Sequence, residues 1–327
     1  MNGWQRRWKT VLWLLVVLMG GCERDTETSR HYDYKIAAIV FQEDQFFRLN
    51  ELGMKAAAAK HNVDLQVGNS FGALDQEIAL VEGYIAAKVN AIVISPLSVK
   101  GSVQALRQAH EHRIKVITYN GFIDAPFPEV SVESDQVELG SNTGKVAANY
   151  VATKLGGKAK VAMIEFVSQA LEQGKMRPDG FRNEITQLPG VEIVTEQDAW
   201  LAPHATSVVE SILTAHPDLN VIWAANEGGT VGATLAVKNR RKAGKVAVFG
   251  TDMNKQIAEF LLSEDNILQA VTGQKPYDMG HLAVEMAVRV LKGEEVPKKI
   301  YTPSVLYSRD KPEAVNQYLA ELGQLSK

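Results

Sequence analysis

Cysteine is almost missing from this sequence: Cys22 is the single one in 327 residues. The chain therefore cannot form an internal disulfide, and a zinc site built on several cysteines is excluded. After residue 21 there is also no apolar run near the roughly 20 residues that a membrane span needs, so no spanning helix is predicted there. Basic charge is not in excess, since the formal net charge is −3, which argues against a nucleic-acid-binding protein.

The lone cysteine lies at the end of an export-signal pattern. Basic residues at positions 6, 7 and 9 precede an apolar stretch over 11–19, which small residues follow. This order is typical of a secretory signal peptide. The segment LMGGC at 18–22 resembles the lipobox of bacterial lipoproteins. The resemblance implies that residues 1–21 are removed, that Cys22 is acylated, and that residues 22–33 form a lipidated tether. A secreted protein with an incidental leader cysteine is the alternative.

Beyond the tether, apolar runs rich in β-branched residues alternate with helical stretches. Strands are predicted at 35–41, 63–68, 91–96, 116–120, 130–134, 160–166, 191–199, 221–226, 246–252 and 267–272, and helices of the second half at 136–155, 173–187, 204–215, 229–241 and 254–263. Near-continuous apolar strands separated by helices indicate parallel sheets that are covered on both faces. The pattern runs through once and then restarts, so the prediction is an α/β fold with two doubly wound parallel-sheet lobes in tandem.

Several short stretches resemble the periplasmic ribose-binding protein family, the type I sugar-binding solute-binding proteins of ABC transporters. The stretches occur in the family's order, and they are FF at 46–47, VITYN at 116–120, SD at 134–135, RPDGF at 177–181, LTAHPD at 213–218, ANE at 225–227, FGTD at 249–252 and GQKP at 273–276. The resemblance implies two lobes joined by a three-strand hinge, with hinge closure on a ligand held between them. The N-terminal lobe would comprise 34–133 and 275–302, and the C-terminal lobe 134–274 and 303–327.

Four polar residues follow predicted strands at their carboxyl ends, where ligands bind in open α/β sheets. They are Asn120, Asn226, Asp252 and Gln274. Any one of them has a structural alternative, because Asn and Asp commonly form Asx turns or cap helices. Four at the same topological position favour ligand binding. Such planar groups suit the vicinal hydroxyls of a sugar or polyol.

The resemblance adds five more candidate ligand-binding residues. Arg177 matches a family position at the start of a helix, where it would donate a fork of hydrogen bonds, and a surface ion pair is the alternative. Asp44 matches a family asparagine. Phe46, Phe47 and Trp200 match stacking positions, where an aromatic ring covers the apolar face of a sugar. The alternative for the two phenylalanines is a hydrophobic start to the first helix.

The chain departs from the family at Asn120-Gly121, where Asp-Arg is common. The change removes a charge-assisted pair to the ligand, and Glu43, Asp44 and Glu227 add acidity nearby. This departure argues against ribose itself. It leaves another pentose or hexose, a polyol, or a ligand with an amine.

An enzyme hypothesis comes from the segment GNSFG at 68–72, which matches the G-x-S-x-G nucleophile elbow with Ser70 as nucleophile. No oxyanion loop and no histidine partner accompany it, so we expect a protein that is not an enzyme and that has no cofactor or metal. The function favoured is a monomeric, lipid-anchored binding protein in the cell envelope that delivers a monosaccharide or polyol to a membrane ABC permease. The alternative is a ligand sensor for a membrane histidine kinase or chemoreceptor.

Overall fold

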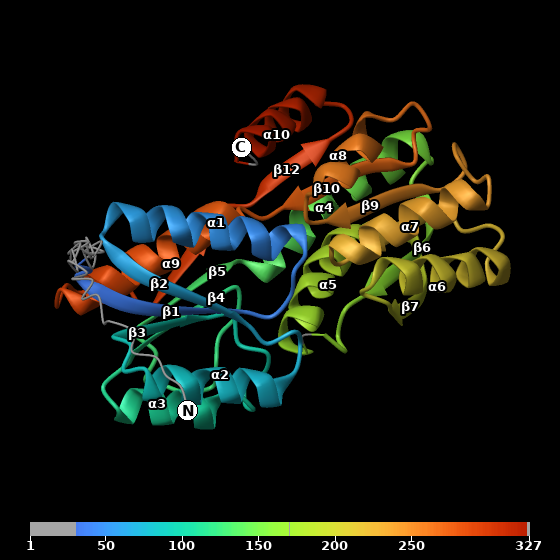
Figure 1. The fold of residues 1–327 in the computed structure, drawn as a ribbon. Coiled ribbons are helices and arrows are strands. Elements are labelled where there is room, and N and C mark those ends of the chain that lie inside the picture. The colour runs from blue at the N-terminus through green and yellow to red at the C-terminus, as the bar shows by residue number, and fades with distance from the viewer. Residues whose placement is uncertain (1–30, 170, 326–327) are drawn as a thin grey trace, which may run out of the picture. The chain divides into compact units, whose positions relative to one another are not determined.

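A computed structural model describes residues 31–169 and 171–325 of the chain. The predicted signal peptide, Cys22 and most of the tether lie outside these residues. None of the described helices is long and apolar enough to cross a membrane. The described chain alternates strands and helices from Tyr34 onward, and its strands form two six-stranded sheets (Figure 1).

The first sheet contains six parallel strands in the order β11-β5-β4-β3-β1-β2. Their bounds are β1 Tyr34–Val40, β2 Val63–Asn69, β3 Ala91–Ile94, β4 Lys115–Tyr119, β5 Val130–Ser134 and β11 Lys299–Thr302. Helices α1 (Gln45–Lys60) and α9 (Pro276–Leu291) pack on one face, and α2 (Leu74–Ala86) and α3 (Val103–Glu111) on the other. Two apolar clusters therefore sandwich the strands, which explains why β3 is buried along its whole length.

The second sheet has the order β12-β10-β9-β8-β6-β7. Its strands are β6 Lys158–Glu165, β7 Gly190–Asp198, β8 Val221–Ala224, β9 Ala247–Thr251, β10 Leu268–Gly273 and β12 Val305–Ser308. One face carries α4 (Gln136–Lys154) and α5 (Leu171–Ile185), and the other α6 (Ala202–Ala215), α7 (Glu227–Asn239), α8 (Lys255–Leu262) and α10 (Pro312–Leu325). Strand β12 is antiparallel to β10, so an otherwise parallel sheet has one antiparallel edge.

The α/β fold with two doubly wound lobes is confirmed, and the chain passes between the sheets three times. It leaves the first sheet after Ser134, returns after Gln274, and leaves again after Thr302. The hydroxyls of Ser134 and Thr302 lie 3.4 Å apart, so the first and third crossings are in contact. The three crossings therefore form the hinge between the lobes.

Helix α9 belongs to the first lobe, although in the sequence it follows every strand of the second sheet except β12. It lies directly against α1, and two glycines make the approach possible. A Cβ at Gly53 would lie 2.0 Å from the carbonyl oxygen of Tyr277, and one at Gly280 would lie 2.1 Å from that of Asn50. Any larger residue at either position would push the two helices apart.

Candidate functional site

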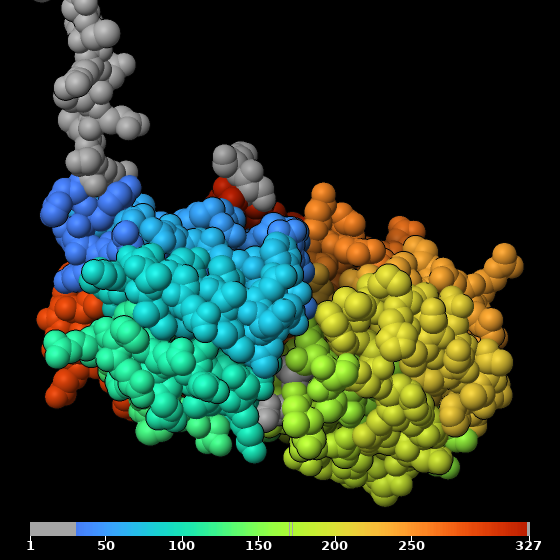
Figure 2. All heavy atoms as spheres, turned by 60° about the horizontal axis from the view of Figure 1, so that its bottom comes forward, coloured from blue at the N-terminus to red at the C-terminus, as the bar shows by residue number. Residues whose placement is uncertain are grey.

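A cavity of about 470 Å³ lies between the lobes, where strands of both sheets end. On one face of the molecule, a furrow separates the first lobe from the second (Figure 2). All nine residues predicted to bind the ligand line this cavity: Asp44, Phe46, Phe47, Asn120, Arg177, Trp200, Asn226, Asp252 and Gln274. The structure thus brings the predicted set together, while the role of each member stays a prediction.

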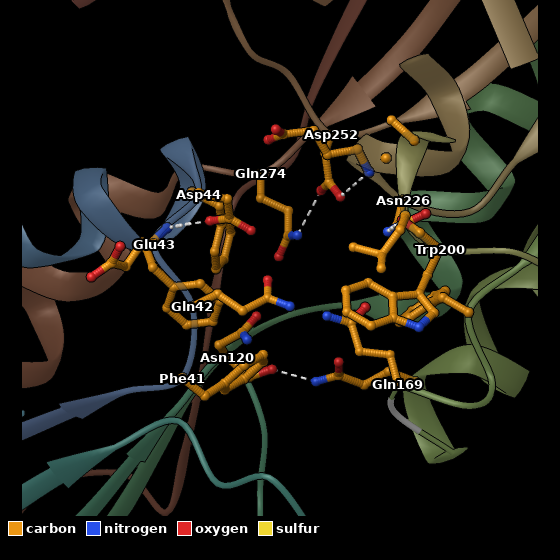
Figure 3. A pocket seen from close by; sticks show the side chains of 18 of the residues that line it. Phe41, Gln42, Glu43, Asp44, Asn120, Gln169, Trp200, Asn226, Asp252 and Gln274 are labelled. Carbon is orange, nitrogen blue, oxygen red and sulfur yellow. Dashed lines mark hydrogen bonds between the residues drawn. The ribbon is translucent and has the colours of Figure 1, made fainter. Parts of the chain in front are cut away.

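Asp252 is the centre of the polar network on the second lobe. It follows β9 with a positive φ of 70° and is 9% exposed. The side-chain amide of Gln274 donates to Oδ1 at 2.7 Å, and the backbone N–H of Glu227 donates to Oδ2 at 3.1 Å (Figure 3). The carboxylate is therefore oriented before any ligand arrives, as a preorganised site requires. The side-chain amide oxygen of Gln274, Oε1, is buried without a hydrogen-bond partner among the described residues.

The prediction that Arg177 begins a helix is wrong, because it lies in the middle of α5. Its side chain is buried, with Nε and Nη2 donating to Oε1 of Gln136 at 3.0 and 2.7 Å. Nη1 donates to the carbonyl of Ala225 at 2.6 Å and lies 3.6 Å from Oδ2 of Asp252. Burial lowers the pKa of the Arg177 guanidinium, and the Asp252 carboxylate opposes that shift. Much of its fork is thus engaged within the second lobe.

Two predicted site residues also cap helices, which was the stated alternative for Asn226 and was not foreseen for Asp44. Asn226 accepts from the N–H of Gly229 at 3.0 Å at the start of α7, and its amide donates to the carbonyl of Trp200 at 3.0 Å. Asp44 accepts from the N–H of Phe47 at 3.0 Å at the start of α1. Burial and the nearby Asp252 raise the pKa of Asp44. Capping and cavity lining are therefore combined in the same side chains.

Asn120 ends β4 in the left-handed region, with φ 59°, a conformation that asparagine tolerates better than most residues. Its amide donates to Oγ of Ser95 at 3.1 Å. Its backbone carbonyl accepts from the side-chain amide of Gln173, which belongs to α5 of the other lobe. A hydrogen bond therefore connects the two lobes beside the cavity.

Aromatic rings line the cavity from both lobes. Phe47 packs against Phe41 and Phe46, with ring centroids 4.4 and 5.2 Å away, while Trp200 lines the cavity from the second lobe (Figure 3). Phe46 and Phe47 both reach the cavity, although Phe47 is also a buried core residue. The arrangement suits a ligand with apolar faces and a polar edge.

Sequence reasoning missed several lining residues: Phe41, Gln42, Phe71, Phe166, Gln169 and Gln173. Two of them had a usable signal, because Phe41 and Phe166 directly follow β1 and β6 at the carboxyl ends of strands. The same rule had selected Asn120 and Asp252. Because only polar residues at strand ends were considered as ligand-binding candidates, Phe41 and Phe166 were not among them.

Glu227 is the most perturbed acid of the cavity. Burial, with smaller contributions from the carboxylates of Asp44 and Asp252, raises its pKa to about 7 against the opposing effect of a hydrogen bond from Asn254. The carboxyl groups of Asp44, Glu227 and Asp252 therefore lie close enough to disfavour one another's ionisation, although Asp44 comes from the first lobe and the other two from the second. The acidity predicted from Glu43, Asp44 and Glu227 is present, since all three line the cavity.

Ser70 does not line the cavity, although the next residue, Phe71, does. Ser70 is 0% exposed, and its Oγ has no hydrogen-bond partner among the described residues. A nucleophile must reach its substrate and a general base. Within the described residues there is also no group of three potential ligands that could hold a metal ion.

The sequence matches a family model described as "Periplasmic binding protein domain" over residues 37–295. It is 32% identical over 293 residues to the ABC transporter periplasmic-binding protein YphF of Escherichia coli (strain K12), covering 87% of this chain and 88% of that relative. It is 30% identical over 259 residues to the ribose import binding protein RbsB of Bacillus subtilis (strain 168), covering 79% and 81%.

A solved structure gives the same result. The ABC transporter periplasmic solute binding protein from Actinobacillus succinogenes 130z, with bound D-allose, superimposes with a TM-score of 0.79. The two chains are 27% identical, and the match covers 86% of this chain and 99% of that one. Fold, cavity and sequence therefore agree that this chain belongs to the periplasmic binding protein family. Members of this family bind solutes without changing them chemically, so the chain is a periplasmic solute-binding protein and not an enzyme.

Proposed function

We propose that this protein captures a monosaccharide or polyol in the cavity between its lobes and delivers it to a membrane ABC permease. The main observation in support of this proposal is the set of side chains that line that cavity. Planar hydrogen-bonding groups that are already oriented, chiefly Asp252, Gln274 and Arg177, lie around a space that Trp200 and Phe46 line with apolar faces. A ring with several hydroxyls presents the complementary pattern, with polar edges and apolar C–H faces.

Relatives with named ligands support this ligand class. The similar solved structure from Actinobacillus succinogenes holds D-allose, and one from Agrobacterium vitis, 25% identical with a TM-score of 0.76, holds α-D-tagatopyranose. The periplasmic domain of a hybrid two-component system, BT1754, is 20% identical, which shows a common fold and carries no argument for signalling. Transport is therefore proposed ahead of sensing.

The functional unit in this proposal is one chain. Residues 34–133 with 275–302 form the N-terminal lobe, and residues 134–274 with 303–327 form the C-terminal lobe. The chain crosses between the sheets near Ser134, Gln274 and Thr302, which supports these boundaries. Closure about the three crossings would bring the walls of the cavity onto the ligand.

We further propose that the protein is a lipoprotein anchored through Cys22. The support is the position of the single cysteine directly after a basic and apolar leader. Several acyl chains would hold the protein at the membrane more firmly than one, since each buried CH₂ contributes about 0.8 kcal/mol. Cys22→Ser should release the protein from the membrane fraction or leave the leader uncleaved. Normal cleavage with unchanged membrane fractionation would contradict the anchor.

A thermal-shift screen of sugars, polyols and amino sugars tests the ligand class. A ligand that binds only the folded chain raises stability by RT ln(1 + [L]/Kd), about 2.7 kcal/mol at a hundredfold excess over Kd. We expect a clear rise in melting temperature with at least one hexose, pentose or cyclitol. Asp252→Asn should markedly reduce that rise. A screen in which amino acids or peptides stabilise the protein and no sugar or polyol does would refute the proposal.

A further inference from the structure

Gln45, the first residue of α1, reaches across from the first lobe to the second beside the cavity. Its Nε2 donates to the hydroxyl of Tyr318 on α10 at 2.7 Å. Its Oε1 accepts from the backbone N–H of Lys255, at the start of α8, at 3.4 Å. Both groups of one amide are therefore directed at the other lobe. Gln45 directly follows Asp44, which lines the cavity.

Tyr318 connects this contact to the loop that carries Asp252. Its hydroxyl accepts from Gln45 and donates to the carbonyl of Met253 at 3.0 Å. Met253 directly follows Asp252, whose positive φ of 70° shows that the loop is held in an uncommon backbone conformation. The Tyr318 hydroxyl thus connects the Asp252 loop of the second lobe to the start of α1 in the first lobe, where Asp44 lies.

The surroundings of the hydroxyl suit this double role. Tyr318 is half-buried, and its ring packs on Tyr307, with centroids 5.6 Å apart. Burial raises the pKa of Tyr318, so the hydroxyl stays protonated and can donate its hydrogen bond to the carbonyl of Met253. A phenolic hydroxyl donates and accepts at once, which is what a junction between a carbonyl and an amide N–H requires.

We infer that Tyr318 is a positioning residue for ligand capture, which fastens the two lobes together beside the cavity and holds the Asp252 loop in its binding conformation. It touches no cavity surface itself, because it is not among the residues that line the cavity. Tyr318 would affect ligand affinity by changing the fraction of molecules in which the lobes and the Asp252 loop are already arranged for binding. An apparent Kd is the intrinsic Kd divided by that fraction, so loss of the fastening weakens binding without removing a ligand contact.

The first test measures lobe separation and needs no ligand. In the full chain with Cys22→Ser, which leaves no native cysteine, Glu82→Cys on α2 and Ser207→Cys on α6 place spin labels on exposed helix positions, one in each lobe. We expect Tyr318→Phe to move the distance distribution toward longer separations. Tyr307→Phe is the matched control, since Tyr307 packs beside Tyr318 and shows no hydrogen bond to α1 in the described part of the chain.

The second test measures affinity by calorimetry with D-allose, D-ribose and myo-inositol as probes, and it rests on the proposed function. Tyr318→Phe should raise Kd roughly three- to tenfold, the range expected when one or two neutral hydrogen bonds are lost. In a Gln45→Ala background the same change should have a smaller effect, because only the hydrogen bond to Met253 is then left to lose. A merely structural role would lower the melting temperature without this dependence on Gln45.

The outcomes distinguish the role of Tyr318 from the proposed ligand class. A shift in lobe separation or in Kd that exceeds that of Tyr307→Phe, and that is smaller in the Gln45→Ala background, supports the role of Tyr318. Equality of Tyr318→Phe with Tyr307→Phe in every measured quantity overturns it. If no probe binds to the wild-type protein, the proposed ligand class is wrong, and the ligand-free distance distribution still decides on Tyr318.

Discussion

Arg177 and Asp252 face each other at the edge of the cavity, with Nη1 of the guanidinium 3.6 Å from Oδ2 of the carboxylate. Their side chains are 4% and 12% exposed, so the pair is almost removed from water. Buried ion pairs depend on both partners, because a single buried charge is left without compensation when the other is removed. The pair thus connects the stability of the second lobe to the polarity of the cavity.

Arg177→Ala should abolish most ligand binding and lower the free energy of unfolding by about 3–5 kcal/mol, the usual cost of breaking a buried pair. Asp252→Asn should reduce affinity at least tenfold with the fold retained. Calorimetry and urea unfolding measure the two effects. Arg182→Ala is the control: Arg182 is also on α5, but its pairs with Asp179 and Glu196 are partly exposed and contribute about 0–1 kcal/mol. Near-wild-type affinity in both cavity variants would mean that the ligand binds elsewhere.

Trp200 should report ligand binding by fluorescence. From Cys22 onward the chain has two tryptophans, Trp200 at the cavity and Trp223 within β8. Trp223 is 0% exposed and stacks on Phe181 at 4.7 Å, so its surroundings should not change on binding. Trp200→Ala should weaken binding and remove most of the ligand-induced signal, whereas Trp223→Phe should keep both. The reverse pattern would show that Trp200 does not contact the ligand.

Glu227 should make stability fall as pH rises. Its pKa is about 7 in the folded protein against an ordinary 4.5, so the folded chain holds a proton that the unfolded chain releases between these values. The associated stability is present in full below pH 4.5 and is lost as pH rises through about 7. In urea unfolding from pH 5 to 8, Glu227→Gln should lose less stability than the wild-type protein.

Glu165 is the matched control for that pH series. Burial and the nearby Glu196 also raise its pKa to about 7, but it does not line the cavity. Glu165→Gln should therefore flatten the stability profile to a similar extent, while only Glu227→Gln alters the pH dependence of ligand affinity. Identical profiles for Glu227→Gln and the wild-type protein would contradict the raised pKa.

Ser70→Ala should leave ligand affinity unchanged, and a serine-reactive phosphonate should not label the wild-type protein. The reason is burial, since Ser70 is inaccessible and makes no contact with the cavity. Mass spectrometry after phosphonate treatment checks this directly. Stoichiometric labelling at Ser70 would revive a hydrolase function.

The positions of the site residues were predictable where one rule of sheet geometry governs them. Asn226 and Asp252 follow parallel strands of the second sheet, and parallel strands of one sheet end at the same edge, so the rule places these two together. The rule places Asn120 at the corresponding edge of the first sheet, and the arrangement of the two lobes brings both edges to the cavity. The two lobes were predictable for the same reason, because buried parallel strands and covering helices leave strong patterns. The antiparallel edge strand β12 leaves no such pattern in four residues.

What each side chain contacts was not predictable. The donors of Arg177 go to Gln136 on α4 and to the carbonyl of Ala225 after β8, partners 41 and 48 residues away. The sequence left open whether Asn226 caps a helix or contacts the ligand. The answer depends on where α7 begins and on the position of the Trp200 carbonyl. Such contacts follow from the packing of distant elements, which local sequence patterns do not encode.

The close contact of α1 with α9 has a consequence for how the chain is made. Synthesis proceeds from the N-terminus, and domains generally fold as they emerge. The first lobe cannot do so, because α9 and the edge strand β11 lie between residues 276 and 302. Until they appear, one apolar face of β3, β4 and β5 and the glycine surface of α1 remain uncovered. The part of the protein that is translated first is therefore among the last to become native, and a ribosome-bound fragment ending before residue 276 should be readily digested by protease.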